Sequence, residues 1–236
     1  MADVIQTMWI GPRLSTMEQL CIKSFLRNGH PFHLYVYEEV EDVPQGTVVL
    51  DANEILPASR IFQYRDHKSY AGFSNFFRYR LLLEKGGWWV DTDMVCLAPF
   101  DLGRDQVFSS EGINGRRHVS CCALRFPPGS AAMQYAWDTC QTMDPAELKW
   151  GQSGPGLAQR AALACGLEAA VAAPEVFCPV HFSQWETMLD GSVSHQFGGS
   201  TRAVHLWNEL WRREGLTKDG AYPPDCLYEQ LKRRYL

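Results

Sequence analysis

The chain has 236 residues, of which 46% are hydrophobic and 21% are charged, with a formal net charge of -5. This length and composition predict one folded domain with a packed core, and they exclude an intrinsically disordered protein. The negative charge argues against a general nucleic-acid partner, since that function needs a basic surface. The 8 cysteines are scattered without a Cys-x-x-Cys pair, which predicts neither a disulfide scaffold nor a zinc site.

The first ten residues lack the basic and apolar segments of a secretory leader. No apolar run approaches the roughly 20 residues that span a bilayer. We therefore expect a cytoplasmic protein with reduced thiols. The basic tail at 232–234, next to Tyr228 and Tyr235, fits peripheral contact with a membrane surface, and it fits a solvated helix face better. Nothing in the sequence indicates an oligomeric state.

The first 50 residues predict a β-α-β pattern. Strands are expected at 4–10, 32–37 and 47–50. Between the first two, Ser15 and Glu18 form a capping box for a helix that runs to about Arg27. Residues 58–71 have no clear period and predict a loop or a weak helix. Alternation of strands and helices favours a parallel sheet with crossover helices.

The rest of the chain continues this alternation. A helix is expected at 74–85, where Gly86 and Gly87 end it. The further elements predicted are strands at 88–91, 94–97, 107–110, 119–125 and 203–206, helices at 130–143 and 157–165, and a surface helix at 227–236. The expected fold class is therefore α/β, a single domain with a mainly parallel central sheet flanked by helices.

Two aspartates stand at the end of a short aromatic strand. The segment from Ser74 to Asp93 reads SNFFRYRLLLEKGGWWVDTD. Open α/β sheets bind ligands at the carboxyl ends of their strands. If the chain stays extended, Asp91 and Asp93 point to the same side. Two convergent carboxylates suit a hard divalent cation, so the pattern predicts a metal site that carries a phosphorylated ligand.

The helix before these aspartates carries two polar residues on one face, Asn75 and Arg78. Because the helix leads directly into the aspartate strand, both could face the same pocket. The guanidinium fork of Arg78 suits hydroxyl and phosphate oxygens. A structural ion pair is an equally good interpretation of Arg78.

The D-x-D pair also fits a second chemistry. In haloacid dehalogenase-type phosphatases and phosphotransferases, an apolar strand precedes D-x-D-x-T/V, and the first aspartate is the nucleophile. The string at 90–95 fits, with Asp91 as nucleophile. That class also needs a downstream Gly-Asp acidic motif, and we find no convincing one after Val95.

The segment resembles the DXD sugar-nucleotide region of glycosyltransferase family 32, whose pattern is roughly A-S-D-x-x-R-x-x-x-L-x-x-x-G-G-x-Y-x-D-x-D. Asn75 stands where the family has Asp, and Trp89 stands where it has Tyr. The matching residues are Ser74, Arg78, Leu82, Gly86, Gly87, Asp91 and Asp93. Three weaker matches follow the family order: Met8-Trp9-Ile10-Gly11 in the first strand, Gly154-Pro155-Gly156 in a turn, and His205-Leu206-Trp207-Asn208 with Trp211 near the C-terminus.

This resemblance implies a GT-A type fold, with a nucleotide-sugar half at about 1–100 and an acceptor half with a C-terminal metal and phosphate segment at about 101–236. It implies transfer of a sugar from a nucleotide diphosphate sugar, a UDP-sugar first, with retention of configuration. The acceptor would be a glycan, a lipid-linked sugar or a small molecule. A non-catalytic sugar-nucleotide-binding module is a third hypothesis, against which the presence of both aspartates, Arg78 and His205 argues.

The resemblance also implies roles for single residues. Asp93 is expected as the direct metal ligand, Asp91 as a ligand of the ribose and the metal, and His205 as the distal ligand. An imidazole beside carboxylates suits Mn²⁺ at least as well as Mg²⁺. A histidine satisfied at a strand end is the alternative for His205.

The remaining expected roles concern the two substrates. Trp9, Ile10 and Gly11 are expected to border the base, although Trp9 also fits a strand-end core position. Trp211 is expected to donate its indole N–H to a phosphate, and Asn75 and Arg78 to contact sugar hydroxyls. The acceptor side is expected at Gly154, Pro155, Gly156 and Trp185. Because Asn75 replaces a carboxylate, the donor sugar stays open.

Overall fold

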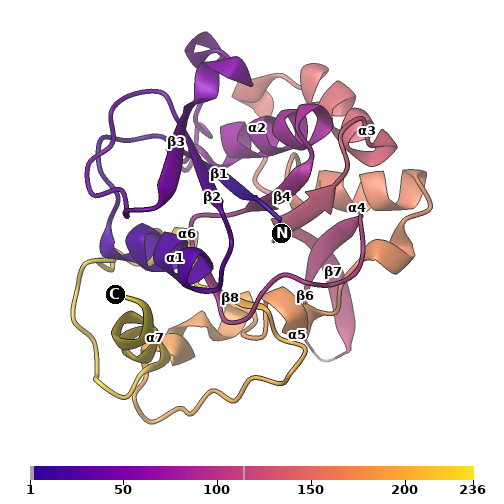
Figure 1. The fold of residues 1–236 in the computed structure, drawn as a ribbon. Coiled ribbons are helices and arrows are strands. Elements are labelled where there is room, and N and C mark those ends of the chain that lie inside the picture. The colour runs from indigo at the N-terminus through magenta and orange to yellow at the C-terminus, as the bar shows by residue number, and fades with distance from the viewer. Residues whose placement is uncertain (1–2, 114) are drawn as a thin grey trace.

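The computed structural model describes residues 3–113 and 115–236. These residues fold around a six-stranded sheet (Figure 1). The strand order is β3-β2-β1-β4-β7-β6. The first four strands in this order are parallel to their neighbours, and β7 and β6 add to the sheet in antiparallel fashion. The bounds are β1 (Ile5–Trp9), β2 (Phe32–Val36), β3 (Thr47–Asp51), β4 (Gly87–Val90), β6 (Val107–Ile113) and β7 (Arg116–Phe126). The expected α/β fold with a mainly parallel sheet is confirmed.

The direction of the strand order reverses between β1 and β4. From β1 the chain moves outward to β2 and β3, and β4 then returns to the other side of β1. Ile5 pairs with Phe32 on one side and with Trp88 on the other. In open α/β sheets such a reversal leaves a crevice at the carboxyl ends of the two neighbouring strands, where ligands bind. Here those ends are Trp9 and Val90.

Helices cover both faces of the sheet (Figure 1). Along β4, Trp88 and Trp89 are both buried and point into opposite core layers, because side chains alternate along a strand. The layer around Trp89 is covered by α2 (Ala71–Glu84), α3 (Ala131–Gln141) and α4 (Pro155–Ala164), and the layer around Trp88 by α1 (Thr16–Arg27) and α5 (Pro174–Phe177). Segments of 3-10 helix lie at Ala52–Glu54, Ala58–Arg60, Pro145–Glu147, Glu168–Ala170 and Phe182–Leu189.

The double glycine ends α2 and starts β4, as expected. Gly86 has a φ of 65° and Gly87 a φ of 88°, both in the left-handed region that favours glycine. The side-chain amide of Gln6, on β1, donates a 2.7 Å hydrogen bond to the carbonyl of Gly86. This turn therefore places β4 directly beside β1.

A small second sheet returns the C-terminal part of the chain to the end of β4. Strand β5 (Met94–Cys96) pairs antiparallel with β8 (Ala203–His205), and Met94 lies opposite His205. Helix α6 (Asn208–Arg213) follows β8. The order of the chain thus brings residues more than a hundred positions apart to one place.

The C-terminal helix α7 (Leu227–Tyr235) is less exposed than expected. Tyr228 and Tyr235 are buried in a cluster that includes residues of α1. The two aromatic rings are therefore not available to a membrane surface, which corrects that part of the membrane-contact hypothesis. Among the described residues, no helix combines the length and the apolar character that crossing a bilayer requires.

Candidate active site

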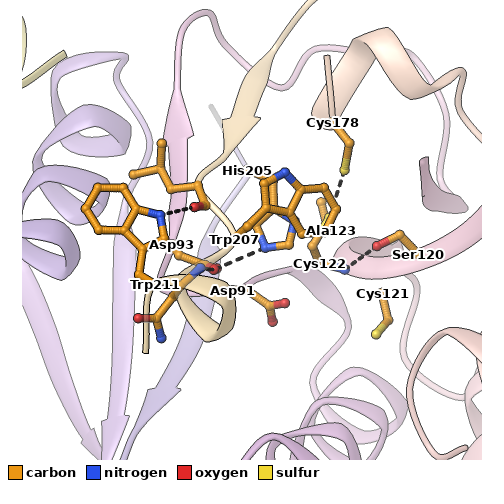
Figure 2. Close-up of polar contacts among 12 residues, drawn as sticks. Asp91, Asp93, Ser120, Cys121, Cys122, Ala123, Cys178, His205, Trp207 and Trp211 are labelled. Atoms are coloured by element: carbon orange, nitrogen blue, oxygen red, sulfur yellow. Dashed lines mark hydrogen bonds and ion pairs between the residues drawn. The ribbon is translucent and has the colours of Figure 1, made fainter. Parts of the chain in front are cut away.

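The two aspartates lie in a turn, not on an extended strand as predicted. Strand β4 ends at Val90, and the N–H of Met94 donates to the carbonyl of Asp91 at 3.2 Å. The carboxylates nevertheless converge, because β8 brings His205 against the same turn. Ligand atoms of Asp91, Asp93 and His205 all lie within 4.8 Å of one another (Figure 2).

Asp93 is the more enclosed of the two carboxylates, with its side chain 11% exposed. Its Oδ2 accepts the backbone N–H of Asn208 at 2.8 Å and lies 3.2 Å from Nε2 of His205. Burial raises the pKa of Asp93, but the charge and hydrogen bond of His205 and the N–H of Asn208 outweigh it and lower the pKa. Asp93 is thus held as a carboxylate.

His205 is fixed between this carboxylate and an aromatic ring. Burial lowers its pKa, but the negative charge of Asp93 raises it well above its usual value. The ring of Trp207 packs 3.9 Å from the His205 ring, centroid to centroid. Trp207 has a φ of 58°, a left-handed conformation that is uncommon for a bulky residue and is seen at functional sites. The next residue, Asn208, starts α6 with its N–H on Asp93.

Asp91 lies on the more open side of the site, with its side chain 25% exposed. It accepts the indole N–H of Trp89 at 2.9 Å, and it pairs with Arg78 at 2.9 Å. Burial raises the pKa of Asp91 to about 6, although Arg78 acts in the opposite direction. The hydrogen bond from Trp89 to Asp91 was not predicted from the sequence. Side chains alternate along a strand, so residues 89 and 91 share one face, and this alternation could have predicted the contact.

Arg78, which was expected to contact sugar hydroxyls, is turned toward the protein interior in this structure. The guanidinium is buried, with the side chain 4% exposed, and all three of its nitrogens are hydrogen-bonded within the protein. Besides Asp91, its partners are the carbonyl of Cys121 at 2.5 Å and Ser74 at 3.1 and 3.3 Å. Arg78 therefore positions Asp91 and faces no open space, so the ion-pair interpretation describes it better.

Asn75 meets the Gly-Pro-Gly turn directly. Its Nδ2 donates to Oγ of Ser153 at 3.1 Å, and a Cβ on Gly154 would lie 3.0 Å from the same Nδ2. Residues expected on the donor side and on the acceptor side are thus neighbours. Pro155 and Gly156 form the first turn of α4. Ser153, which is fully buried, was not recognised from the sequence.

Trp9, Ile10 and Gly11 lie at the carboxyl end of β1, next to the strand that leads to Asp91. Trp9 is half-buried, and its indole N–H is buried without a hydrogen-bond partner among the described residues. The ammonium of Lys218 lies 5.3 Å from the centroid of its ring. These three residues stand at the crevice where the strand order reverses.

Two expected ligand-binding tryptophans belong to the protein interior. Trp211 is fully buried, and its indole N–H donates to the carbonyl of Leu206 at 2.8 Å. Trp185 is 7% exposed and packs against Trp211, with ring centroids 6.1 Å apart. In this structure neither ring faces open space where a phosphate or an acceptor could reach it: both rings complete the core under β8 and α7.

A pair of thiols lies on the other side of His205. Sγ of Cys122, on β7, is 3.5 Å from Sγ of Cys178, which follows α5. These two sulfurs and a nitrogen of His205 also lie within 4.8 Å of one another (Figure 2). The thiols are 56 residues apart, so spacing gave no signal for this cluster.

Two family models match the chain, one on each side of residue 111. Residues 15–111 match the glycosyltransferase sugar-binding region containing the DXD motif. Residues 144–235 match the conserved region of alpha 1,4-glycosyltransferases. No curated protein sequence matches the chain.

Solved structures resemble the fold. One, described as the PaToxG glycosyltransferase, is 12% identical with a TM-score of 0.51, and the match covers 99% of this chain and 87% of that one. Another, described as a transferase mutant, is 10% identical with a TM-score of 0.46 over 78% of this chain and 89% of that one. The first likeness supports the fold seen here.

Proposed function

We propose that this chain, which belongs to the DXD-containing glycosyltransferases related to family 32, transfers a sugar from a nucleotide diphosphate sugar to a hydroxyl acceptor. The reaction would use a divalent cation and would retain the anomeric configuration of the sugar. The observation that carries this proposal is the convergence of Asp91, Asp93 and His205 at the carboxyl end of β4. A UDP-sugar is the first donor to test. The acceptor class is a glycan, a lipid-linked sugar or a small molecule.

The residues present fit a cation. Asp91 and Asp93 supply carboxylate oxygens and His205 supplies an imidazole nitrogen, all within 4.8 Å. Neighbouring ligands on an octahedral cation with metal–oxygen distances of about 2.1 Å lie about 3.0 Å apart. Nε2 of His205 and Oδ2 of Asp93, which are 3.2 Å apart, are already close to that separation. A nitrogen among oxygens favours Mn²⁺ over Mg²⁺. When bound, the cation neutralises negative charge that develops on a diphosphate leaving group.

The surrounding residues prepare the two carboxylates for this task. Asn208 and His205 keep Asp93 ionised, and Arg78 and Trp89 fix the orientation of Asp91. Ligation by Nε2 requires that His205 give up its hydrogen bond to Asp93. We assign Asp93 as the principal metal ligand and the more exposed Asp91 as the one that also reaches the ribose.

The substrates are assigned by place in the fold. The base would lie at Trp9, Ile10 and Gly11, where the half-buried ring of Trp9 offers an aromatic surface. The sugar would lie toward Asn75, whose neighbour Gly154 begins the acceptor side. This divides the single domain into a nucleotide-sugar half at about 1–100 and an acceptor half at about 101–236.

A donor screen tests the proposal. Wild type with Mn²⁺ is expected to release nucleoside diphosphate from at least one of UDP-glucose, UDP-galactose, UDP-GlcNAc and GDP-mannose. The release should vanish in Asp93→Ala and with chelator, and it should persist in Asp138→Asn, which changes an exposed carboxylate on α3. Phosphate release from a sugar phosphate without any nucleotide release would instead indicate a phosphatase with Asp91 as nucleophile. Donor binding without turnover would indicate a non-catalytic module.

The stereochemical part has its own test. We propose front-face attack, in which a donor phosphate oxygen accepts the proton of the acceptor hydroxyl. NMR of the first product should show the donor's anomeric configuration. A sugar trapped covalently on an enzyme carboxylate would contradict this mechanism.

A further inference from the structure

We propose that Cys122, Cys178 and Nδ1 of His205 form a second metal site, which takes a thiophilic cation such as Zn²⁺. This site lies on the opposite side of the imidazole from the aspartates (Figure 2). It was not expected from the sequence, because the cysteines lack the close spacing of usual zinc motifs. The fold brings the sulfurs together through β7 and the residue that caps α5.

The geometry agrees with tetrahedral coordination. With Zn–S bonds of about 2.3 Å and a Zn–N bond of about 2.05 Å, tetrahedral ligands lie about 3.8 Å (S to S) and about 3.5 Å (S to N) apart. The two sulfurs are 3.5 Å apart, and a nitrogen of His205 lies within 4.8 Å of both. Three protein ligands leave a fourth position for water, which is the ligand number of catalytic zinc sites.

An independent observation concerns His205. The residue is more than nine-tenths buried, and its Nδ1 has no hydrogen-bond partner among the described residues. A buried polar atom left unpaired costs about 1–3 kcal/mol, so it indicates a missing partner. The other nitrogen, Nε2, is held by Asp93. In zinc sites, a metal-bound histidine usually donates its other ring N–H to a carboxylate or a carbonyl.

Charge balance favours the same cation. Two thiolates and a neutral imidazole around Zn²⁺ have no net charge, so this group can be buried among apolar residues at little electrostatic cost. Cys122 and Cys178 are each 2% exposed and lie in the core layer with Phe177 and Ala123. Binding would release the thiol protons and any proton on Nδ1 to solvent.

The shared histidine links the two sites. One neutral imidazole has one free lone pair, so a metal on Nδ1 leaves a proton on Nε2, which then donates to Asp93. Filling the thiol site therefore removes His205 from the ligands available beside the aspartates. Mn²⁺ should bind about tenfold more weakly to the zinc-loaded protein than to the zinc-free protein, since a lost or reoriented ligand typically costs that much.

Cobalt and zinc titrations of the reduced, metal-free full chain test the proposal without any assay of transfer. Co²⁺ should produce thiolate-to-cobalt charge-transfer absorption at about one equivalent, and Zn²⁺ should displace it. The absorption should disappear in Cys178→Ser and persist in Cys121→Ser. Cys121 is the control, because it precedes Cys122 on β7 but points toward Asn75 on the opposite face.

Several results would overturn the proposal. The first is the absence of charge-transfer absorption in folded wild type. The second is unchanged absorption in Cys178→Ser, and the third is a Mn²⁺ affinity that does not respond to zinc. A Cys122–Cys178 disulfide in non-reduced protein, with no zinc binding after reduction, would assign the thiols as a redox pair instead. If the serine variants fail to fold, X-ray absorption of zinc-loaded wild type decides: the proposal requires two sulfur ligands at about 2.3 Å. The response of Mn²⁺ affinity rests on the proposed function, but the cobalt absorption and the sulfur ligands of zinc depend neither on donor turnover nor on the Mn²⁺ site. A failure of those two readouts is therefore distinct from a failure of the proposed function.

Discussion

Replacing Trp211 by Phe separates an interior role of this ring from a role in donor binding. Trp211 is fully buried between the rings of Trp185, Tyr222 and Tyr228, at centroid distances of 6.1, 5.5 and 4.9 Å. Its N–H is the donor to the carbonyl of Leu206. Phe keeps most of the ring packing and removes this donor.

The loss of stability can be estimated from these contacts. An unpaired buried carbonyl costs about 1–3 kcal/mol, and the smaller ring leaves a void worth about 1 kcal/mol more. We therefore expect Trp211→Phe to lower the free energy of unfolding by about 3 kcal/mol. For a chain of this size, that lowers Tm by about 6–12 °C.

Urea unfolding and titration with UDP and Mn²⁺ check the two sides of this prediction. The urea midpoint should fall, while the dissociation constant for UDP should stay within about twofold, well under 1 kcal/mol. Trp150→Phe is the matched stability control: Trp150 is 42% exposed, and its replacement should change stability by less than about 0.5 kcal/mol. An unchanged midpoint with UDP binding weakened tenfold would mean that Trp211 touches the ligand and has no interior role.

Three further predictions concern the support of the site. Arg78→Met should destabilise the protein by about 2–4 kcal/mol and weaken Mn²⁺ binding, because it leaves Asp91 without its buried cation. Thermal melting measures the loss of stability, and Mn²⁺ titration measures the loss of affinity. An unchanged Mn²⁺ affinity would contradict the role of Arg78 in positioning Asp91. Gly86→Ala should lower the free energy of unfolding by about 2–5 kcal/mol, because the added Cβ would collide with Pro128 and the residue has a positive φ. Gly129→Ala is the control: it also has a positive φ but open space around it, and it should lower the same quantity by about 1–2 kcal/mol. Equal losses for the two variants in urea unfolding would exclude the collision. Chelation of divalent cations should abolish donor turnover and leave the circular dichroism spectrum unchanged, and Mn²⁺ should restore activity better than Mg²⁺; full turnover in chelator would exclude the metal requirement.

Local patterns in the sequence predicted local structure well. The capping box forms as expected, with the N–H of Ser15 donating to Glu18 at 2.9 Å at the start of α1. The double glycine ends α2 and places β4. Both signals depend on a few neighbouring residues, so their physical cause is fully present in the sequence.

Sequence patterns did not predict contacts between residues that are far apart in the chain. Whether Trp211 donates to a ligand or to Leu206 depends on how β8 and α6 pack, which no spacing in the sequence reveals. The thiol pair depends on strand β7 meeting the end of α5. His205 was placed beside Asp93 only through family resemblance, and Arg78 proved to hold Asp91 because α2 and β4 pack closely.

Anomalous scattering at the manganese edge, from a crystal soaked with Mn²⁺ and UDP, would place the metal and the nucleotide together. We expect a manganese peak bonded to the Asp93 carboxylate, with the diphosphate on the far side of the metal and the base at Trp9–Gly11. UDP bound away from the ends of β1 and β4, or a manganese peak that touches neither Asp91 nor Asp93, would show that the aspartates do not form the donor site.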